Sequence, residues 1–341
     1  MLCRYCNTHC ATDAHFCKTC GASLQHAAYS QVLPALGQQG PSPARGNKAI
    51  LFFLLYFVGF QFVFAFVIGF LGLNLSPLLS IVLVQVVGLF VPFICYLQFT
   101  KQSIDQVLPW KGLGAKNALM VVIISLAILP AVHMLARLAS FVFVTVEVPI
   151  TEPMWLVVAV IAVLPSLFEE FLFRGMMYTE YHAGGVSIHK IALISGIFFG
   201  LMHLNFYQAI YTTLLGVLYA YMVHYTRSIL APMLAHFVNN GIAVVLGYQG
   251  WYASLWGNVP MFLLVIGVAM IVMTPVVLLC LNQMKKHHER TQEPSPAPTF
   301  DNTTMPQHKP QANVFTWAFW VALIVFFVIT LNSEITLRML F

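Results

Sequence analysis

The residues of this sequence that could do chemistry are a few polar side chains inside long apolar runs. Glu169 and Glu170 lie in one run, His203 lies in a second, and His236 with Asn240 lies in a third. A charge inside a membrane span costs roughly 2.5–3.5 kcal/mol on insertion scales, so its presence calls for a partner or a function. Carboxylates and imidazoles together favour acid–base hydrolysis.

Helical spacing separates the two adjacent carboxylates. Glu170 and Arg174 are four residues apart and share a helix face, so they can form an ion pair. Glu169 is turned away by about 100° and points elsewhere. One carboxylate therefore has a local counter-ion and its neighbour does not, which suits Glu169 to general base catalysis. The alternative is that both carboxylates brace the cytosolic end of the helix, because interfacial Glu–Arg pairs are common.

The two histidines allow a functional and a structural interpretation. His236 and Asn240 are also four residues apart, and either side chain can donate a hydrogen bond to a developing oxyanion. A lone histidine in an apolar helix, such as His203, is more often a hydrogen-bonded structural residue. The helical rise of about 1.5 Å per residue places Glu169, His203 and His236 in one layer between the bilayer centre and its cytosolic face. This agreement in depth favours a single polar site.

The elements that must position these residues are membrane-spanning helices. Only 8% of the 341 residues are charged and 60% are hydrophobic, whereas about a quarter of an average globular chain is charged. The mean hydropathy is +0.83. Runs of about 20 apolar residues can cross a bilayer. The predicted spans cover residues 49–73, 76–99, 118–143, 154–178, 190–206, 208–225, 229–248, 260–282 and 314–333.

The predicted fold class is therefore all-α, a polytopic transmembrane helix bundle of about nine spans with a small N-terminal zinc ribbon. Lys and Arg residues at alternate ends of the spans predict a cytosolic N-terminus and an integral membrane protein of the cell membrane, if the source is bacterial. This placement also argues against nucleic-acid binding. The predicted domains are a zinc ribbon (1–21), a flexible linker (22–48), a helical domain (49–282), a polar linker (283–313) and a last helix (314–341).

The zinc ribbon is predicted from four cysteines in two Cys-x-x-Cys pairs. Cys3 and Cys6 form the first pair, and Cys17 and Cys20 form the second. Four thiolates presented in this way bind Zn²⁺ tetrahedrally, and so short a module has no core without the metal. Cys10 is a spare that could compete as a ligand. We expect a structural zinc here that supports a protein partner, with a redox or disordered tail as the alternative.

The polar residues of the spans also resemble a known family. Glu-Glu-x-x-x-Arg, Phe-x-x-x-His and His-x-x-x-Asn, in this order on three spans, are similar to the motifs of the CAAX-protease and bacteriocin-processing (CPBP) family of intramembrane proteases. The resemblance covers roughly residues 150–245. The motif positions are filled by Glu169, Glu170, Arg174, Phe199, His203, His236 and Asn240.

The resemblance implies roles for the catalytic positions. Glu169 with His203 would activate a water molecule for attack on a peptide carbonyl. His236 and Asn240 would stabilise the tetrahedral oxyanion. The substrate would be a membrane protein or lipidated peptide, CAAX-like or prenyl-like anchored, cleaved near the cytosolic face. Partners would then be this substrate and the lipid bilayer.

The resemblance also implies support for the helix that carries the base, from Glu170 and Arg174. The family was first described as metalloproteases and later as glutamate-dependent enzymes. Two histidines and a glutamate could bind Zn²⁺ with an open position, so a catalytic metal stays possible. The pairing of His236 with Asn240 favours the metal-free chemistry, because it suits an oxyanion hole better than a metal shell.

Competing functions remain open at this point. The chain could be a non-catalytic membrane scaffold or a bacteriocin-immunity-type protein with the same fold, and a transporter is the third possibility. The motifs of other intramembrane proteases, His-Glu-x-x-His, Gly-x-Gly-Asp and Gly-x-Ser-x-Gly, do not occur. Four tyrosines after the second motif are interpreted as interface anchors and packing residues, with the lining of a substrate path as the alternative for some of them. They are Tyr207, Tyr211, Tyr219 and Tyr221.

Overall fold

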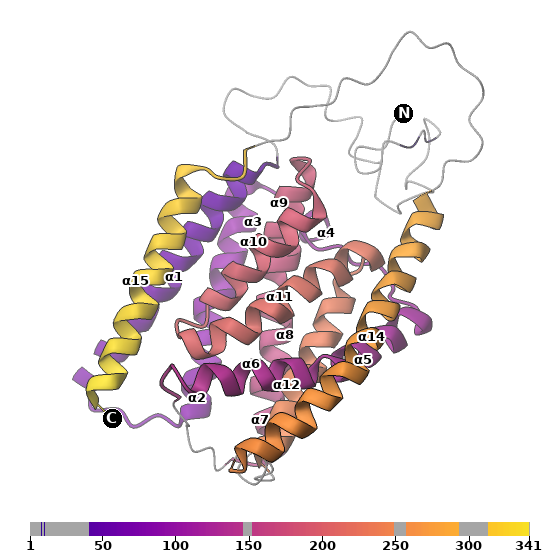
Figure 1. Cartoon of the computed structure of the whole chain (residues 1–341). Coiled ribbons are helices and arrows are strands. Elements are labelled where there is room, and N and C mark those ends of the chain that lie inside the picture. The colour runs from indigo at the N-terminus through magenta and orange to yellow at the C-terminus, as the bar shows by residue number, and fades with distance from the viewer. Residues whose placement is uncertain are drawn as a thin grey trace, which may run out of the picture.

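The computed structural model describes Thr8, Cys10 and residues 41–145, 152–248, 257–292 and 313–340. Throughout these ranges the regular structure is helical, and the helices pack into one all-α bundle (Figure 1). Eight helical stretches in these ranges are long and apolar enough to cross a membrane. The chain is therefore a multi-pass membrane protein. The four cysteines predicted to bind zinc, Cys3, Cys6, Cys17 and Cys20, lie outside the described residues.

Several of the spanning stretches are continuous runs of two or more helical elements. The first three stretches are α1 (Pro43–Phe70), α2 (Pro77–Gln85) with η2 (Val86–Phe90) and α3 (Val91–Thr100), and α5 (Ala115–Ala127) with α6 (Leu129–Ser140). The fourth is α7 (Met154–Val158), η3 (Ala159–Val163), α8 (Leu164–Glu170), η4 (Phe171–Met177) and α9 (Tyr178–Ala183). The others are α11 (Phe206–Thr226), α12 (Leu230–Tyr248), α14 (Val259–Gln292) and α15 (Trp317–Leu340).

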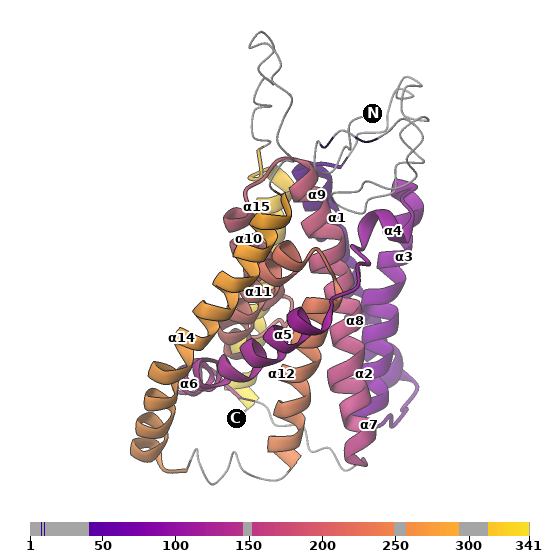
Figure 2. The ribbon, with the colours of Figure 1, turned by 90° about the vertical axis from the view of Figure 1, so that its right-hand side faces the viewer.

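The predicted span 190–206 is shorter than a membrane crossing. It forms α10 (Ile188–Leu201), a helix of 14 residues, whereas a crossing needs about 20. The chain turns after α10 and returns antiparallel along α11, and these two helices pack closely (Figure 2). The structure therefore corrects the count of nine spanning helices to eight in the described residues. It also places His203 in the turn after α10 and not within a spanning helix.

Glycines allow the close packing of α10 against α11. A Cβ atom on Gly216 would lie 2.8 Å from the Cα of Gly196, and one on Gly200 would lie 2.2 Å from the Oγ1 of Thr213. Real Cβ contacts are not this short, so larger side chains would separate the helices. Small residues at helix–helix contacts are the usual means of close approach in membranes. The backbone of α11 can thus reach Arg174 of η4.

We expect Gly216→Val to lower the melting temperature of the purified protein markedly. The added side chain must push α11 away from Gly196 and Phe199, and overpacking of this kind costs about 1–3 kcal/mol or more. Gly267→Val on α14 is the matched control, because a Cβ there meets nothing within 4 Å. Thermal unfolding in detergent measures both variants. Equal melting temperatures would show that the α10–α11 contact is not tight.

The helices α1 and α14 extend into the segments predicted as linkers. The helix α1 begins at Pro43, within the predicted linker 22–48, because the side chain of Ser42 caps it by accepting a hydrogen bond from the Arg45 N–H at 3.2 Å. The helix α14 runs to Gln292, within the predicted linker 283–313. The first turns of α1 and the last turns of α14 carry Lys and Arg residues. Their long side chains place the charge at the membrane interface while the backbone stays helical.

Buried polar contacts join the starts of α1 and α15 to the ends of α3 and α9. Glu180 of α9 is fully buried and pairs with Arg45 of α1 at 2.7 Å. Tyr96 of α3 donates its hydroxyl hydrogen to the same carboxylate. Asn47 of α1 donates to the carbonyl of Val314, just before α15, at 2.6 Å. These elements therefore begin or end at one end of the bundle, which we call the α1 end.

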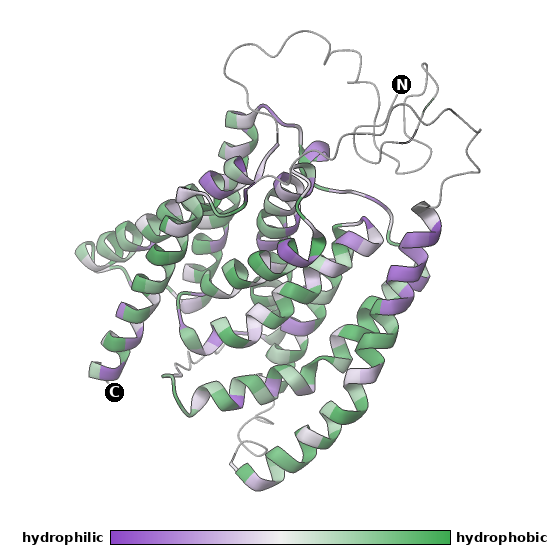
Figure 3. Ribbon diagram, turned by 45° about the horizontal axis from the view of Figure 1, so that its top comes forward, coloured by the Kyte–Doolittle hydropathy of each residue, from purple (hydrophilic) through white to green (hydrophobic). Residues whose placement is uncertain are grey.

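The charges of the described residues are unequal at the two ends of the bundle. Hydrogen bonds between loops and helix ends show which segments lie at each end. At the α1 end, the Ile229 N–H donates to the carbonyl of Pro109 at 2.9 Å. At the opposite end, the Val144 N–H donates to the Glu334 carboxylate at 3.1 Å. Figure 3 shows hydrophobic residues along the bundle and a hydrophilic end on α14. The basic residues near the α1 end are Arg45, Lys48, Lys101, Lys111, Lys116, Lys190, Arg227, Lys285, Lys286 and Arg290.

Candidate functional site

A buried ion pair between Glu170 and Arg174 lies at the centre of the polar cluster. Arg174 Nη1 lies 3.2 Å from the Glu170 carboxylate, and both side chains are fully buried. The spacing-based prediction of this pair is confirmed. His236 of α12 is a third member, because its Nδ1 lies 2.9 Å from Glu170 Oε1. The Glu170 carboxylate of α8 therefore binds two groups, the Arg174 guanidinium of the adjoining η4 and the His236 imidazole of α12.

Arg174 is fixed from the α10–α11 side as well. Its Nη2 donates to the carbonyl of Gly216 at 2.8 Å. Its guanidinium lies over the ring of Phe199, 4.5 Å from the centroid, and 5.3 Å from that of Tyr219. Aromatic faces attract cations, so these rings help to hold a charge that has left water. The close packing of α10 and α11 at Gly216 brings this carbonyl within reach of Arg174.

Phe199 of α10 lies between the two histidines. The His203 and His236 rings each lie 5.6 Å from the Phe199 ring, in edge-to-face arrangements. The structure thus gathers the second and third sequence motifs around one aromatic side chain. Phe199, one of the motif positions of the resemblance, thus packs against both imidazoles.

The turn that carries His203 is held by local bonds. His203 Nδ1 lies 3.0 Å from the carbonyl of Phe199. Asn205 donates to the carbonyl of His203 at 3.0 Å and caps α11 by accepting from the Gln208 N–H at 2.7 Å. Leu204 adopts a φ of 52°, in the left-handed region that non-glycine residues rarely occupy. Such strain persists only where the surroundings over-determine the backbone, so the position of His203 is strongly constrained.

The partners of the two histidines determine where their protons lie. A carbonyl and an ionised carboxylate only accept hydrogen bonds, so Nδ1 is the donor in both His203 and His236. The Nε2 of neutral His203 then carries a lone pair and can accept a proton from water. Because Nδ1 of His236 is bonded to Glu170, its Nε2 can donate only in the protonated imidazole.

Asn240 lies one helical turn beyond His236 and joins α12 to the motif helix. Its Nδ2 donates to the carbonyl of Ile161 at 3.0 Å. Pro165 has no N–H with which to reach this carbonyl, four residues before it, so the amide satisfies a free acceptor. An asparagine amide has a second N–H. Asn240 can therefore bind Ile161 and donate to a ligand at once.

The motif helix is π-helical on both sides of the carboxylates. The segment η3 precedes α8, and η4 follows Glu170 directly. Wider turns of this kind are often found at functional sites, because they re-aim side chains and free carbonyl groups. Pro165 at the start of α8 gives one sequence signal for this irregularity. The rest of it could not be inferred from residue spacing.

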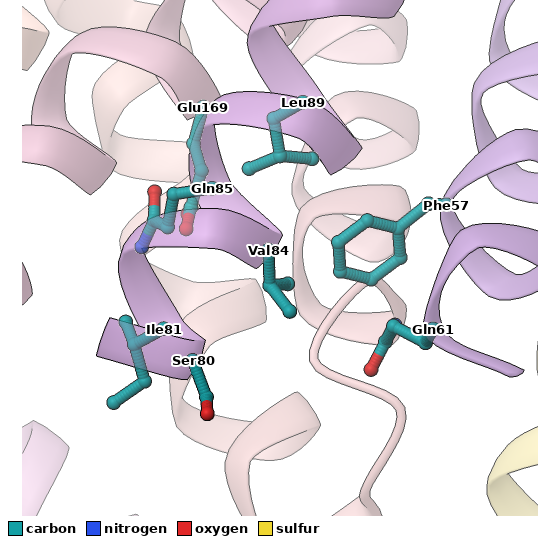
Figure 4. Close-up of a pocket in the computed structure, with 8 residues that line it drawn as sticks. All are labelled: Phe57, Gln61, Ser80, Ile81, Val84, Gln85, Leu89 and Glu169. Carbon is teal, nitrogen blue, oxygen red and sulfur yellow. The ribbon is translucent and has the colours of Figure 1, made fainter. Parts of the chain in front are cut away.

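Glu169 faces a cavity of about 300 Å³ that α8 shares with α1, α2 and η2 (Figure 4). Its side chain is half-buried. Among the described residues, no hydrogen bond joins Glu169 to His203, so the structure does not bring this predicted pair into direct contact. Glu169 still interacts electrostatically with Arg174 and with Tyr219. The carboxylate therefore lies between the cavity and the buried cluster.

Two members of the cluster were missed by the sequence interpretation. Tyr219 was assigned to packing, but its hydroxyl donates to Asn239 Oδ1 at 2.9 Å and its ring stacks on His236 with centroids 5.5 Å apart. Asn239 donates in turn to the carbonyl of Ser125 at 2.9 Å. The position of Asn239, three residues after His236 on one helix, was the available signal. The sequence offered no signal that separates Tyr219 from the other three tyrosines.

The donor set of the cluster does not fit a three-ligand zinc site. Within the described ranges, no group of three or more His, Cys, Asp or Glu side chains could hold a metal ion. The second imidazole, His203, is bonded to the carbonyl of Phe199 and not to Glu170. No step below is therefore routed through a catalytic metal.

Residues 151–242 match the family model described as type II CAAX prenyl endopeptidase Rce1-like. The match covers about a quarter of the chain, from α7 into α12. It contains all the polar residues that the structure gathers around Phe199. Comparison with curated proteins and with solved structures gives no match.

Proposed function

We propose that this protein is an intramembrane endopeptidase that hydrolyses a peptide bond of a membrane-associated substrate. The observation that carries the proposal is the convergence of His203, His236 and the Glu170–Arg174 pair around Phe199. This convergence lies inside the segment that matches a family model of CAAX prenyl endopeptidases. The buried Glu170 and His236 and the half-buried Glu169 and His203 supply the carboxylates and imidazoles that acid–base hydrolysis needs.

Glu169 and His203 activate the attacking water. The water binds to the lone pair on Nε2 of His203 and transfers a proton to the Glu169 carboxylate as its oxygen attacks the carbonyl carbon. When the tetrahedral intermediate collapses, the C–N bond breaks and the leaving amine takes the proton from Glu169. A water molecule can bridge two groups that do not touch, so this mechanism does not require a direct contact between Glu169 and His203.

His236 and Asn240 stabilise the oxyanion. Protonated His236 donates from Nε2, while its Nδ1 stays bonded to Glu170. Asn240 donates its second N–H, while the first stays bonded to Ile161. Donors held in place before the reaction stabilise developing charge without reorganisation. Arg174 balances the charge of Glu170.

The distribution of basic residues supports a cytosolic α1 end. Ten Lys and Arg residues of the described chain lie near that end. The opposite end carries Arg338, in an ion pair with Glu334 at 2.9 Å, and Arg137 in the last turn of α6. Cytosolic loops are enriched in Lys and Arg. The site would then act on CAAX-like or prenyl-like anchored substrates from the cytosolic side of the cell membrane, if the source is bacterial. The cysteine module would bind structural zinc and a protein partner.

The test is cleavage of CAAX peptides, with and without a prenyl group, by the purified full-length protein in liposomes. We expect His203→Ala to reduce kcat/KM by about 10²–10⁴-fold, because the water loses its acceptor. His133→Ala is the matched control, since Nδ1 of His133 bonds the carbonyl four residues before it in the same way, at 2.7 Å. Retained activity in His203→Ala would contradict the assigned role.

A non-catalytic scaffold predicts a different result from the same material. The native protein would then cleave no peptide, and His203→Ala would change only stability or expression. A metal-dependent mechanism predicts that a chelator abolishes cleavage and that Zn²⁺ restores it. Repeating that treatment on a variant with Cys3 and Cys6 replaced by serine separates a catalytic metal from the predicted structural one.

A further inference from the structure

The cavity beside Glu169 contains two glutamine side chains that the mechanism above does not use. Gln61 lies on α1 and Gln85 lies at the end of α2, on opposite sides of the cavity in Figure 4. The other lining residues are Phe57, Ser80, Ile81, Val84 and Leu89. Counted along α1 from Ala49, where the apolar run begins, Gln61 lies roughly 18 Å in, close to the middle of a hydrocarbon core of about 30 Å.

Both amides have a buried polar atom without a partner. Gln61 Nε2 and Gln85 Oε1 are buried and form no hydrogen bond with any described residue. Burying a polar group without a hydrogen bond is costly, and lipid offers no replacement partner. Two such groups in one cavity therefore indicate that a polar ligand satisfies them.

We propose that this cavity is a substrate subsite in which Gln61 and Gln85 hydrogen-bond the backbone of an extended peptide segment beside Glu169. The inference rests on the proposed function, because it places the scissile segment next to the general base. It identifies the ligand as a polypeptide main chain and not as a side chain.

The chemistry of the two amides matches a peptide backbone. A glutamine amide offers both N–H donors and a carbonyl acceptor, and a peptide unit offers one of each. An extended segment cannot satisfy these groups within lipid, so it gains more from a paired amide than a folded helix does. The apolar side chains of Val84 and Leu89 leave the remaining wall suited to hydrophobic substrate side chains.

The size and the surroundings of the cavity fit this occupant. Its volume of about 300 Å³ is about ten times that of one water molecule in the liquid and lies at the lower end of ligand sites. Phe62 and Val63, which follow Gln61 on α1, expose 69% and 62% of their surface. The cavity thus adjoins the lipid-facing surface, where a membrane-anchored substrate is located.

The test uses Gln61→Leu and Gln85→Leu in the full-length protein. We expect each substitution to raise KM by about three- to tenfold, the effect of losing one net hydrogen bond, with kcat less affected. The melting temperature should stay unchanged or rise, because an unpartnered buried amide is removed. Gln98→Leu is the matched control, an exposed glutamine on α3 of the same span. A lower melting temperature with unchanged KM would overturn the proposal.

Peptide analogues with one backbone N–H replaced by N–CH₃ identify the bonded group. Methylation at the unit bound by the glutamines should weaken binding to the native protein and have much less effect on the leucine variants. Equal weakening in all proteins would overturn a main-chain contact.

Binding is also measured without catalysis, by photocrosslinking a peptide to a probe placed at Val84. Crosslinking that Gln85→Leu reduces supports the subsite even if no cleavage occurs. Cleavage without crosslinking at Val84 rejects the subsite and leaves the proposed function intact.

Discussion

Glu169→Gln should reduce peptide cleavage by about 10²–10⁴-fold while the protein stays folded, which is the range that general base catalysis contributes. The substitution keeps the size of the side chain and its ability to line the cavity, but an amide does not take a proton from water. Glu169 is half-buried and is not part of the buried ion pair, so its neutral replacement should cost little stability. Single-turnover cleavage and thermal unfolding measure the two effects separately.

The control for this variant is Glu289→Gln, which removes a carboxylate that is 59% exposed and lies 3.8 Å from Lys285 on α14. It should change neither activity nor stability, because exposed ion pairs contribute about 0–1 kcal/mol. Full activity of Glu169→Gln would contradict the assignment of Glu169 as the general base. If Glu170→Gln were then inactive with an unchanged melting temperature, Glu170 would be the general base.

Arg174→Met should give the largest loss of stability, because it leaves the buried Glu170 carboxylate without its cation. Removing one partner of a buried ion pair costs about 3–5 kcal/mol. The guanidinium also holds the carbonyl of Gly216 at 2.8 Å, and that acceptor would be left unpaired. We expect a sharply lower melting temperature in detergent, and activity falling in proportion to the folded fraction.

The double variant Glu170→Gln with Arg174→Met separates the loss of the ion pair from the loss of side-chain packing at Arg174. Neutralising both partners should recover part of the stability lost in Arg174→Met, because no unpaired charge is then buried. His236 would still lose its carboxylate partner, so activity should not return with stability. Additive losses in the double variant would show that the two charges do not depend on each other.

The sequence determined the fold class and most spanning helices, because a run of apolar residues is insoluble in water and helical in lipid. Eight of the nine predicted runs form helices of spanning length. The remaining run, residues 190–206, forms the short helix α10, because the chain turns back toward the α1 end at residues 202–205. A turn at membrane depth depends on packing against α11. The hydropathy of one segment carries no information about its contact with another.

For the site, the sequence determined which residues share a helix face. The pair of Glu170 with Arg174 followed from four-residue spacing alone. Only the tertiary structure showed that His236 bonds Glu170, that Phe199 lies between the two imidazoles, and that Tyr219 joins them.

The positions of Glu169 and Glu170 are therefore determined at two levels. Periodicity decides the direction of a side chain on its own helix, so the sequence separated Glu169 from Glu170. The neighbours of each carboxylate depend on how helices distant in the chain pack, and close approach at Gly196, Gly200 and Gly216 decides that packing. This is the physical reason that the ion pair was predictable, whereas the cavity shared by Glu169, Gln61 and Gln85 was visible only in the folded bundle.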